Sequence, residues 1–117
     1  MADVSSSIQE FERSRAQLGA IESQAQGLNI QSQVLEEAIK ELKDTKEKKV
    51  YKAVGNILVL SDTKKVEKEL SDQKETIELR LKTVKKQEEV MLDKLNKLKA
   101  EIESAQKAAS KEKTEGK

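Results

Sequence analysis

Apolar side chains recur along this chain with alternating gaps of three and four residues. In the first part, one seven-residue column carries Val, Phe, Leu, Ala, Ser and Ile at positions 4, 11, 18, 25, 32 and 39. The other carries Ser, Ser, Ile, Leu, Leu and Leu at positions 7, 14, 21, 28, 35 and 42. This is the spacing of the a and d positions of a coiled coil, so we predict a helix over residues 4–47.

The second part of the chain repeats the same period. One column is apolar throughout and consists of Leu70, Ile77, Val84, Met91, Leu98 and Ala105. Its companion consists of Leu81, Leu95, Ile102 and Ala109, with interruptions at Lys74 and Glu88. Because the chain has no proline, we predict a second unbroken helix over residues 62–109. Residues 110–117 are charged, carry no apolar period and are predicted to be a frayed or disordered tail.

Between the two helical patterns lies a segment of a different kind, residues 50–60, which is rich in β-branched and aliphatic residues. Gly55-Asn56 at its centre suits the positive φ angles of a tight turn, which predicts a β-hairpin. Ser61, Asp62 and Thr63 follow as possible N-cap residues of the second helix. The fold class is therefore mainly α: a long antiparallel two-helix coiled coil with a central β-hairpin. We expect residues 1–117 to form a single domain.

The predicted hairpin lacks partners within its own chain. A two-stranded hairpin is marginal in water, and the strand Ile57 to Leu60 is apolar on both faces. No other segment has the pattern of a strand, so both edges would stay open. We therefore predict an obligate oligomer in which hairpins of several subunits close an intersubunit β-barrel. The expected interface residues are Val50, Tyr51, Val54, Gly55, Ile57, Leu58, Val59 and Leu60.

The opposite end of the coiled coil, its tip, has a weaker seam. Ser7, Ser14 and Ala25 occupy seam positions there, and Gly19 and Gly27 each cost a helix about 1 kcal/mol relative to alanine. Two helices cannot bury all the apolar side chains expected near this tip, which are Val4, Ile8, Phe11, Leu98, Ile102 and Ala105. They could form an exposed binding surface or be ordinary seam residues at a fraying helix end. Spacing alone leaves both interpretations open.

Composition narrows the classes of function. Charged residues make up 38% of the chain, but they nearly cancel, with 23 basic against 22 acidic residues, which disfavours non-specific binding to nucleic acid. The chain has no His and no Cys, so we expect no zinc site, no His-based catalytic site and no cofactor. No apolar run is long enough to cross a bilayer and no signal peptide is recognisable. We expect a cytoplasmic, non-enzymatic protein that binds neither membranes nor nucleic acid.

A cluster of lysines flanks the predicted hairpin and is a weaker candidate site. It consists of Lys46, Lys48, Lys49, Lys52, Lys64 and Lys65. These cations could bind an anion, but Asp44, Glu47 and Asp62 are interleaved with them. We therefore favour a solvated linker over an anion site.

The hairpin also carries a family signature. Val50-Tyr51-Lys52-x-x-Gly55-x-Ile57-Leu58-Val59 resembles the hairpin of beta-type prefoldin subunits. A second stretch, Glu75-Thr76-x-x-Leu79-Arg80-x-x-Thr83-x-x-x-Gln87-Glu88-Glu89, is similar to the second helix of that family. Asn56 stands where eukaryotic beta-type subunits commonly have proline, so the chain most resembles archaeal prefoldin beta subunits.

This resemblance implies an ATP-independent molecular chaperone. Two alpha and four beta subunits would join through their hairpins, and the coiled-coil tips would hold unfolded client proteins and pass them to a group II chaperonin. Lys107, Lys111 and Lys113, at the distal end, are the expected docking residues for the chaperonin. The alternative is a structural coiled-coil scaffold or tether. Both functions need the helices, but only the chaperone needs apolar tips that remain uncovered.

Overall fold

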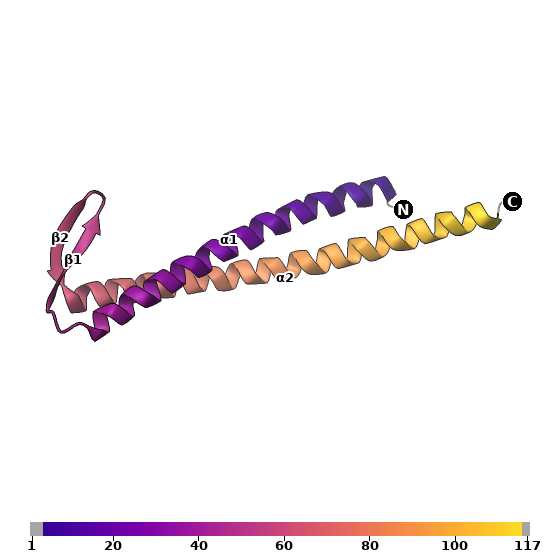
Figure 1. Ribbon diagram of the computed structural model, residues 1–117. Helices are drawn as coiled ribbons and strands as arrows, with labels where there is room; N and C mark the ends of the chain where they lie inside the picture. Colours follow the sequence, from indigo (N-terminus) through magenta and orange to yellow (C-terminus); the bar gives the residue numbers. More distant parts are fainter. Residues whose placement is uncertain (1–3, 116–117) are drawn as a thin grey trace. The chain divides into compact units, whose positions relative to one another are not determined.

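A β-hairpin lies between two long helices along the chain in the computed structural model. The structure describes residues 4–115, and their side chains as far as Ala109. The elements follow in the order α1 (Val4–Asp44), β1 (Lys49–Val54), β2 (Ile57–Asp62) and α2 (Thr63–Glu115) (Figure 1). The helices and the central antiparallel hairpin confirm the predicted fold class. Helix α2 continues to Glu115, through most of the segment predicted to be a frayed or disordered tail. Ala, Lys and Glu favour helix there, and no Pro or Gly lies between Thr63 and Gly116.

The chain divides into two compact units, each of which contains part of both helices. The terminal unit comprises Met1–Gln24 and Val84–Lys117. The hairpin unit comprises Ala25–Thr83.

In both units the segment of α1 runs antiparallel to the segment of α2. In the terminal unit, Val4 shares a hollow with Ile102, whereas Glu10 lies against Lys94, with 2.6 Å between carboxylate Oε1 and Nζ. Residue numbers therefore rise along one helix as they fall along the other.

The same direction holds in the hairpin unit. Glu36 Oε2 lies 3.9 Å from Lys74 Nζ, and Leu42, further along α1, shares a groove with Thr63 at the start of α2.

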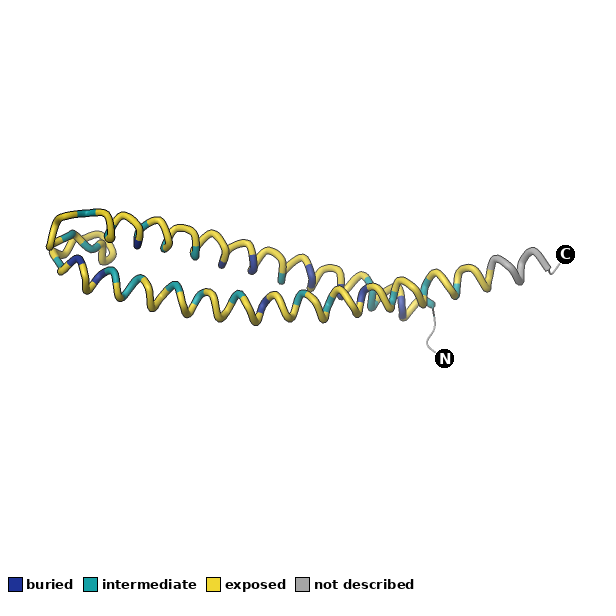
Figure 2. The backbone as a smooth tube through the Cα atoms, turned by 90° about the horizontal axis from the view of Figure 1, so that it is seen from below, coloured by how far each residue is buried: buried dark blue, intermediate teal, exposed yellow. Residues whose placement is uncertain are grey.

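Burial follows the predicted heptad columns closely. All twelve predicted positions of α1 and every position of the apolar column of α2 are buried or half-buried (Figure 2). Ala109, at the end of the companion column, is exposed. Val66 was not predicted but is buried, because it precedes Leu70 by one helical turn on the same side of α2. The core is thus a narrow seam within each unit.

The hairpin has a two-residue turn. Strands β1 and β2 pair antiparallel from Lys49 opposite Asp62 to Val54 opposite Ile57. Gly55 has a φ of 60°, whereas no other residue in the described range has a positive φ. The prediction was right for Gly55 and wrong for Asn56. Positive φ at the first central residue only is typical of a type II′ turn, which suits the twist of paired strands.

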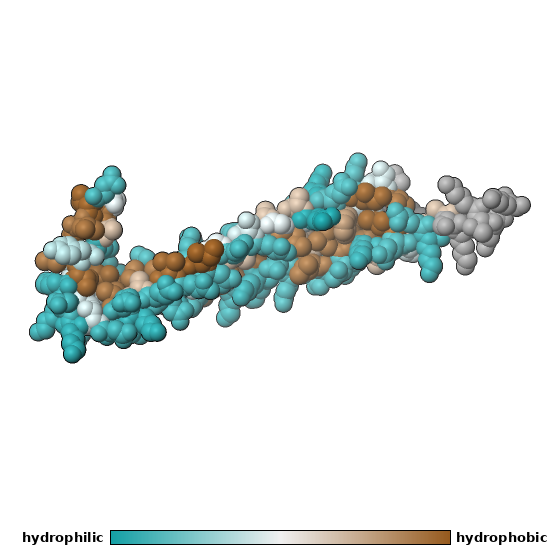
Figure 3. All heavy atoms as spheres, in the orientation of Figure 1, coloured by the Kyte–Doolittle hydropathy of each residue, from teal (hydrophilic) through white to brown (hydrophobic). Residues whose placement is uncertain are grey.

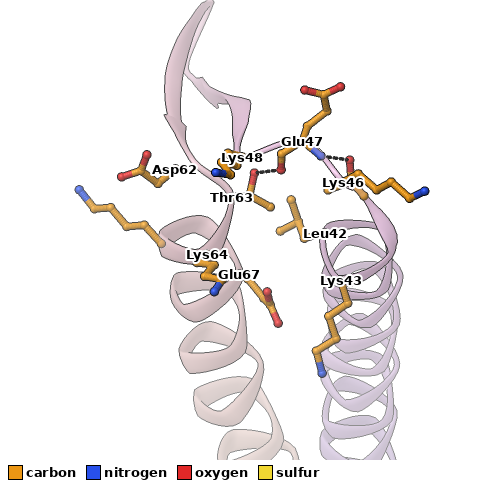
Figure 4. Close-up of a pocket in the computed structure, with 11 residues that line it drawn as sticks. Leu42, Lys43, Lys46, Glu47, Lys48, Asp62, Thr63, Lys64 and Glu67 are labelled. Atoms are coloured by element: carbon orange, nitrogen blue, oxygen red, sulfur yellow. Dashed lines mark hydrogen bonds between the residues drawn. The ribbon is translucent and has the colours of Figure 1, made fainter.

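The linker between α1 and β1 is tied to the start of α2 by Thr63, which is only 6% exposed. Its hydroxyl donates to the Glu47 carbonyl at 2.7 Å, and its backbone N–H donates to the Lys48 carbonyl at 2.9 Å. The Glu47 N–H in turn donates to Thr45 Oγ1 at 3.2 Å (Figure 4). The Thr63 hydroxyl therefore holds the linker instead of accepting a hydrogen bond as a helix cap.

Candidate functional site

The hairpin displays apolar side chains on both of its faces. The cross-strand register places Tyr51 beside Leu60 on one face and Val54 beside Ile57 on the other. Tyr51 is 70% exposed and Leu58 is 69% exposed, and brown apolar surface covers much of the hairpin in Figure 3. Val50 is half-buried; the other predicted interface residues, all exposed, are Tyr51, Val54, Gly55, Ile57, Leu58, Val59 and Leu60.

Ion pairs hold the base of the hairpin. Lys52 Nζ lies 2.7 Å from Glu69 Oε2 on α2, and Lys49 Nζ lies 2.6 Å from Asp62 Oδ1 on the partner strand. The hydrogen bond from each lysine lowers the pKa of the carboxyl group that it contacts. Among the described residues, each strand pairs only with the other, so both outer edges remain open to further strands.

Two hollows open along the helix pair of the terminal unit. The smaller, about 230 Å³, is lined by Val4, Ser7, Glu101, Ile102 and Ala105. It brings together three of the residues predicted at the tip.

The larger hollow measures about 420 Å³ and has a mainly apolar lining. Ile8, Phe11 and Ile102 form its apolar part, and Glu12, Arg15, Lys99, Glu103 and Gln106 complete it. We call this hollow the Phe11 groove. Of the predicted tip residues, only Leu98 lines neither hollow; it is half-buried in the seam.

Sequence reasoning missed the charged rim of the Phe11 groove. Arg15 follows Phe11 by four residues, and on α2 Lys99 lies three residues before Ile102 and four before Glu103. That spacing was a usable signal for neighbours on one helix face. It could not show that both helices contribute to one groove.

Two serines occupy seam positions of the terminal unit, and Ser7 also lines the smaller hollow. Ser7 is buried, and Ser14 is fully buried with its Oγ lacking a hydrogen-bond partner in the described part of the chain. A buried hydroxyl without a partner costs about 1–3 kcal/mol. The seam of the terminal unit is therefore weak, as the serines at its seam positions led us to predict.

One cross-helix ion pair stabilises the terminal unit. Lys94 Nζ donates to Glu10 Oε1 at 2.6 Å, and this hydrogen bond lowers the pKa of the Glu10 carboxyl group. Because the pair is exposed to solvent, its contribution to stability is small and weakens with salt.

The lysine cluster beside the hairpin lines an open groove of about 660 Å³ (Figure 4). Lys46, Lys48, Lys64 and Lys65 contribute to it, as does Lys43. Acidic side chains of Glu47, Asp62 and Glu67 line the same groove, and Leu42 adds an apolar part. This mixture of charges supports a solvated linker more than an anion site.

The expected chaperonin-docking lysines are only partly described. Lys107 is exposed on α2. The side chains of Lys111 and Lys113 lie outside the described residues.

Within the described residues, no group of three or more acidic side chains is arranged to hold a metal ion. None of the helices described is long and apolar enough to span a membrane.

Comparisons with known proteins agree with this architecture. The family model described as "Prefoldin subunit" matches residues 5–109. The chain is 35% identical to the prefoldin subunit beta of Pyrobaculum calidifontis over 107 residues, which cover 87% of this chain and 86% of the relative. It is 53% identical over 53 residues to that of Saccharolobus islandicus, and this match spans 45% of this chain but only 42% of the relative's length.

A solved structure gives the same result for the fold. The crystal structure of the prefoldin beta subunit from Thermococcus strain KS-1 superimposes with a TM-score of 0.82 at 30% sequence identity. The match covers 87% of this chain and 90% of the Thermococcus chain.

Proposed function

The chain belongs to the prefoldin subunit family, and we propose that it is a beta-type subunit of an ATP-independent chaperone that holds unfolded proteins. Membership of this family supports a chaperone-type role. The holding of clients by this chain is our proposal, and the observation that carries it is the apolar Phe11 groove in the terminal unit.

The Phe11 groove suits weak, reversible contact with apolar segments. Unfolded proteins expose such segments, and each Å² of apolar surface removed from water contributes about 25 cal/mol. A groove formed by Ile8, Phe11 and Ile102 would therefore contribute roughly 2–4 kcal/mol, which alone gives only weak binding. Several subunits acting together would hold a client firmly while each contact stays rapidly reversible. Release then needs no ATP.

The hairpin supports assembly with other prefoldin subunits. Its apolar faces and open strand edges would be covered if hairpins from several subunits closed a β-barrel. We propose a complex of two alpha and four beta subunits. The terminal unit of each subunit would provide the client-binding surface.

We further propose that the complex works in the cytoplasm and delivers clients to a group II chaperonin. Exposure of Lys107 near the end of α2 supports docking through basic side chains, with Lys111 and Lys113 as further contacts. Removal of residues 110–117 together with Lys107→Ala should weaken chaperonin binding at low salt. Unchanged affinity would exclude this role for the lysines.

The decisive test is suppression of aggregation of an unrelated denatured protein without ATP. The complex formed with an alpha subunit should suppress aggregation, and Phe11→Ser with Ile102→Ser should abolish suppression while complex mass stays unchanged. Gln9→Ser with Lys97→Ser, at exposed positions of the same unit, is the matched control. A complex that assembles but never holds clients would instead be a structural scaffold.

A further inference from the structure

Four charged side chains surround the apolar part of the Phe11 groove, and the proposed function does not use them. We call them the groove rim; they are Glu12 and Arg15 from α1, and Lys99 and Glu103 from α2. Each helix contributes one acid and one base, so each wall of the groove carries both signs of charge. All four residues are exposed. A client segment that buries apolar side chains in the groove would pass directly beside these charges.

The rim charges do not neutralise one another. The two rim residues on each helix are three or four residues apart, a spacing at which opposite charges on a helix can pair. None of the four forms an ion pair with any residue in the described part of the chain. In the same unit, Glu10 and Lys94 do pair across the helices, at 2.6 Å. A ligand can therefore contact the rim charges without breaking an existing ion pair.

The apolar segments of an unfolded protein are seldom free of charge. About a quarter of the residues in an average protein are charged, with both signs represented. A client segment several residues long therefore brings charges of either sign to the rim. A rim of one sign would disfavour part of these segments, because like charges side by side at an interface oppose binding. A rim with both signs on each wall offers an opposite charge to every segment.

The spacing of the rim charges suits an extended client segment. Opposite charges on one wall are separated along the helix by about 4.5–6 Å, at about 1.5 Å per residue. Neighbouring residues of an extended chain are about 3.3 Å apart. A client charge one or two residues from a buried apolar side chain can therefore reach an opposite rim charge on either wall.

We propose that the groove rim lets the Phe11 groove accept apolar client segments flanked by charges of either sign. The two rim glutamates contact basic flanks, and the rim arginine and lysine contact acidic flanks. This inference rests on the proposed function, since the groove must hold clients for its rim to contact them. The apolar side chains supply the affinity, and the rim removes discrimination by charge. Clients are then selected by their apolar content.

Peptides that share one apolar centre of leucine and phenylalanine but differ in their flanks test this selectivity. The flanks are aspartates, lysines or glutamines. The natural complex, formed with an alpha subunit, should bind all three peptides with dissociation constants within about threefold of one another. The same alpha subunit is used in every complex, so differences between complexes report on the rim. Complex mass is measured for each variant to check assembly.

Variants with a rim of one sign should acquire a charge preference. Glu12→Gln with Glu103→Gln leaves only cations in the rim, so the aspartate-flanked peptide should bind about fivefold more tightly than the lysine-flanked one. Arg15→Gln with Lys99→Gln should reverse this preference. Both preferences should disappear at about 1 M salt, where the screening length falls to about 3 Å.

Matched controls remove the same kinds of charge outside the groove. Glu22→Gln with Glu89→Gln removes two acids at exposed positions of the terminal unit. Arg13→Gln with Lys97→Gln likewise removes one arginine and one lysine. None of these four residues lines either hollow. The controls change the net charge of the chain as the rim variants do, but they should leave the relative affinities for the three peptides unchanged.

Two outcomes would overturn the inference and leave the proposed function standing. If the assembled rim variants bind the three peptides with the same relative affinities as the natural complex, the rim does not contact clients. If the natural complex prefers one kind of charged flank by more than about tenfold, the groove discriminates by charge. A natural complex that binds none of the peptides and does not suppress aggregation would overturn the proposed function as well.

Discussion

Gly55 is the residue whose backbone conformation most constrains the hairpin. Its φ of 60° lies in the left-handed region, where a side chain costs roughly 1–2 kcal/mol. We expect Gly55→Ala to destabilise the assembled complex by about that amount, as measured by the midpoint of urea denaturation. Asn56→Ala, at the neighbouring turn position with ordinary φ, is the control and should have little effect. Equal effects of the two substitutions would mean that the turn relaxes without cost.

Ser14 is expected to weaken the seam of the terminal unit. Its fully buried hydroxyl has no hydrogen-bond partner among the described residues, so Ser14→Ala should stabilise the chain by about 1 kcal/mol or more. Alanine also has the higher helix propensity, and Ser23→Ala, at an exposed position of α1, measures that part alone. Thermal unfolding of both variants checks the prediction. A gain no larger than that of Ser23→Ala would show that the Ser14 hydroxyl finds a partner.

At the scale of elements, the periodic and local features could be predicted from the sequence, whereas contacts between residues distant in the sequence could not. The heptad columns identify the seam because side chains three and four residues apart share one helix face. The Gly55 turn identifies the hairpin for a similarly local reason. In contrast, the Lys52–Glu69 pair joins two of many exposed charges, and nothing in the sequence selects one partner over another. The sequence suggested that the Thr63 hydroxyl caps the second helix, but in the structure it donates a hydrogen bond to the carbonyl of Glu47, 16 residues away.

The Phe11 groove illustrates the same limit. Sequence spacing placed Ile8 and Phe11 near Ile102 at the tip but could not distinguish a groove from ordinary seam contacts. The distinction depends on how the side chains of both helices pack around the groove. That is a property of two packed helices, not of either pattern alone.

The contact between hairpin and α2 should respond to acid. The hydrogen bond from Lys52 lowers the pKa of Glu69 below its ordinary value of 4.5. A carboxyl group whose pKa is lowered in the folded chain contributes stability that is fully present above its ordinary pKa. This stability is lost as the pH falls through the lowered pKa. We expect amide signals of β1 and the first turns of α2 to change together as pH falls below 4.5. Glu69→Gln should show that change at neutral pH, and Glu67→Gln should not.

At the scale of the whole molecule, the distribution of apolar residues explains why the chain is suited to assembly. The seam uses enough of them to form a helix pair in each unit, while others are exposed on the hairpin and exposed or half-buried in the Phe11 groove. Exposed apolar surface of this kind marks sites of interaction with other proteins. In the proposed complex the hairpin surface is covered permanently by other subunits, and the groove is covered only when a client is bound.

Weak grooves acting together predict how client holding depends on the number of intact tips. If natural chains are mixed with Phe11→Ser/Ile102→Ser chains before assembly, holding should fall faster than the fraction of intact subunits. The reason is that each lost contact removes a multiplying factor from the avidity of the complex. Suppression of client aggregation, measured across a series of mixing ratios at constant complex concentration, gives this dependence. Mixtures with Gln9→Ser/Lys97→Ser chains should show no fall. A strictly proportional fall would mean that each subunit holds a client independently, and the cooperative part of the proposed mechanism would then be wrong.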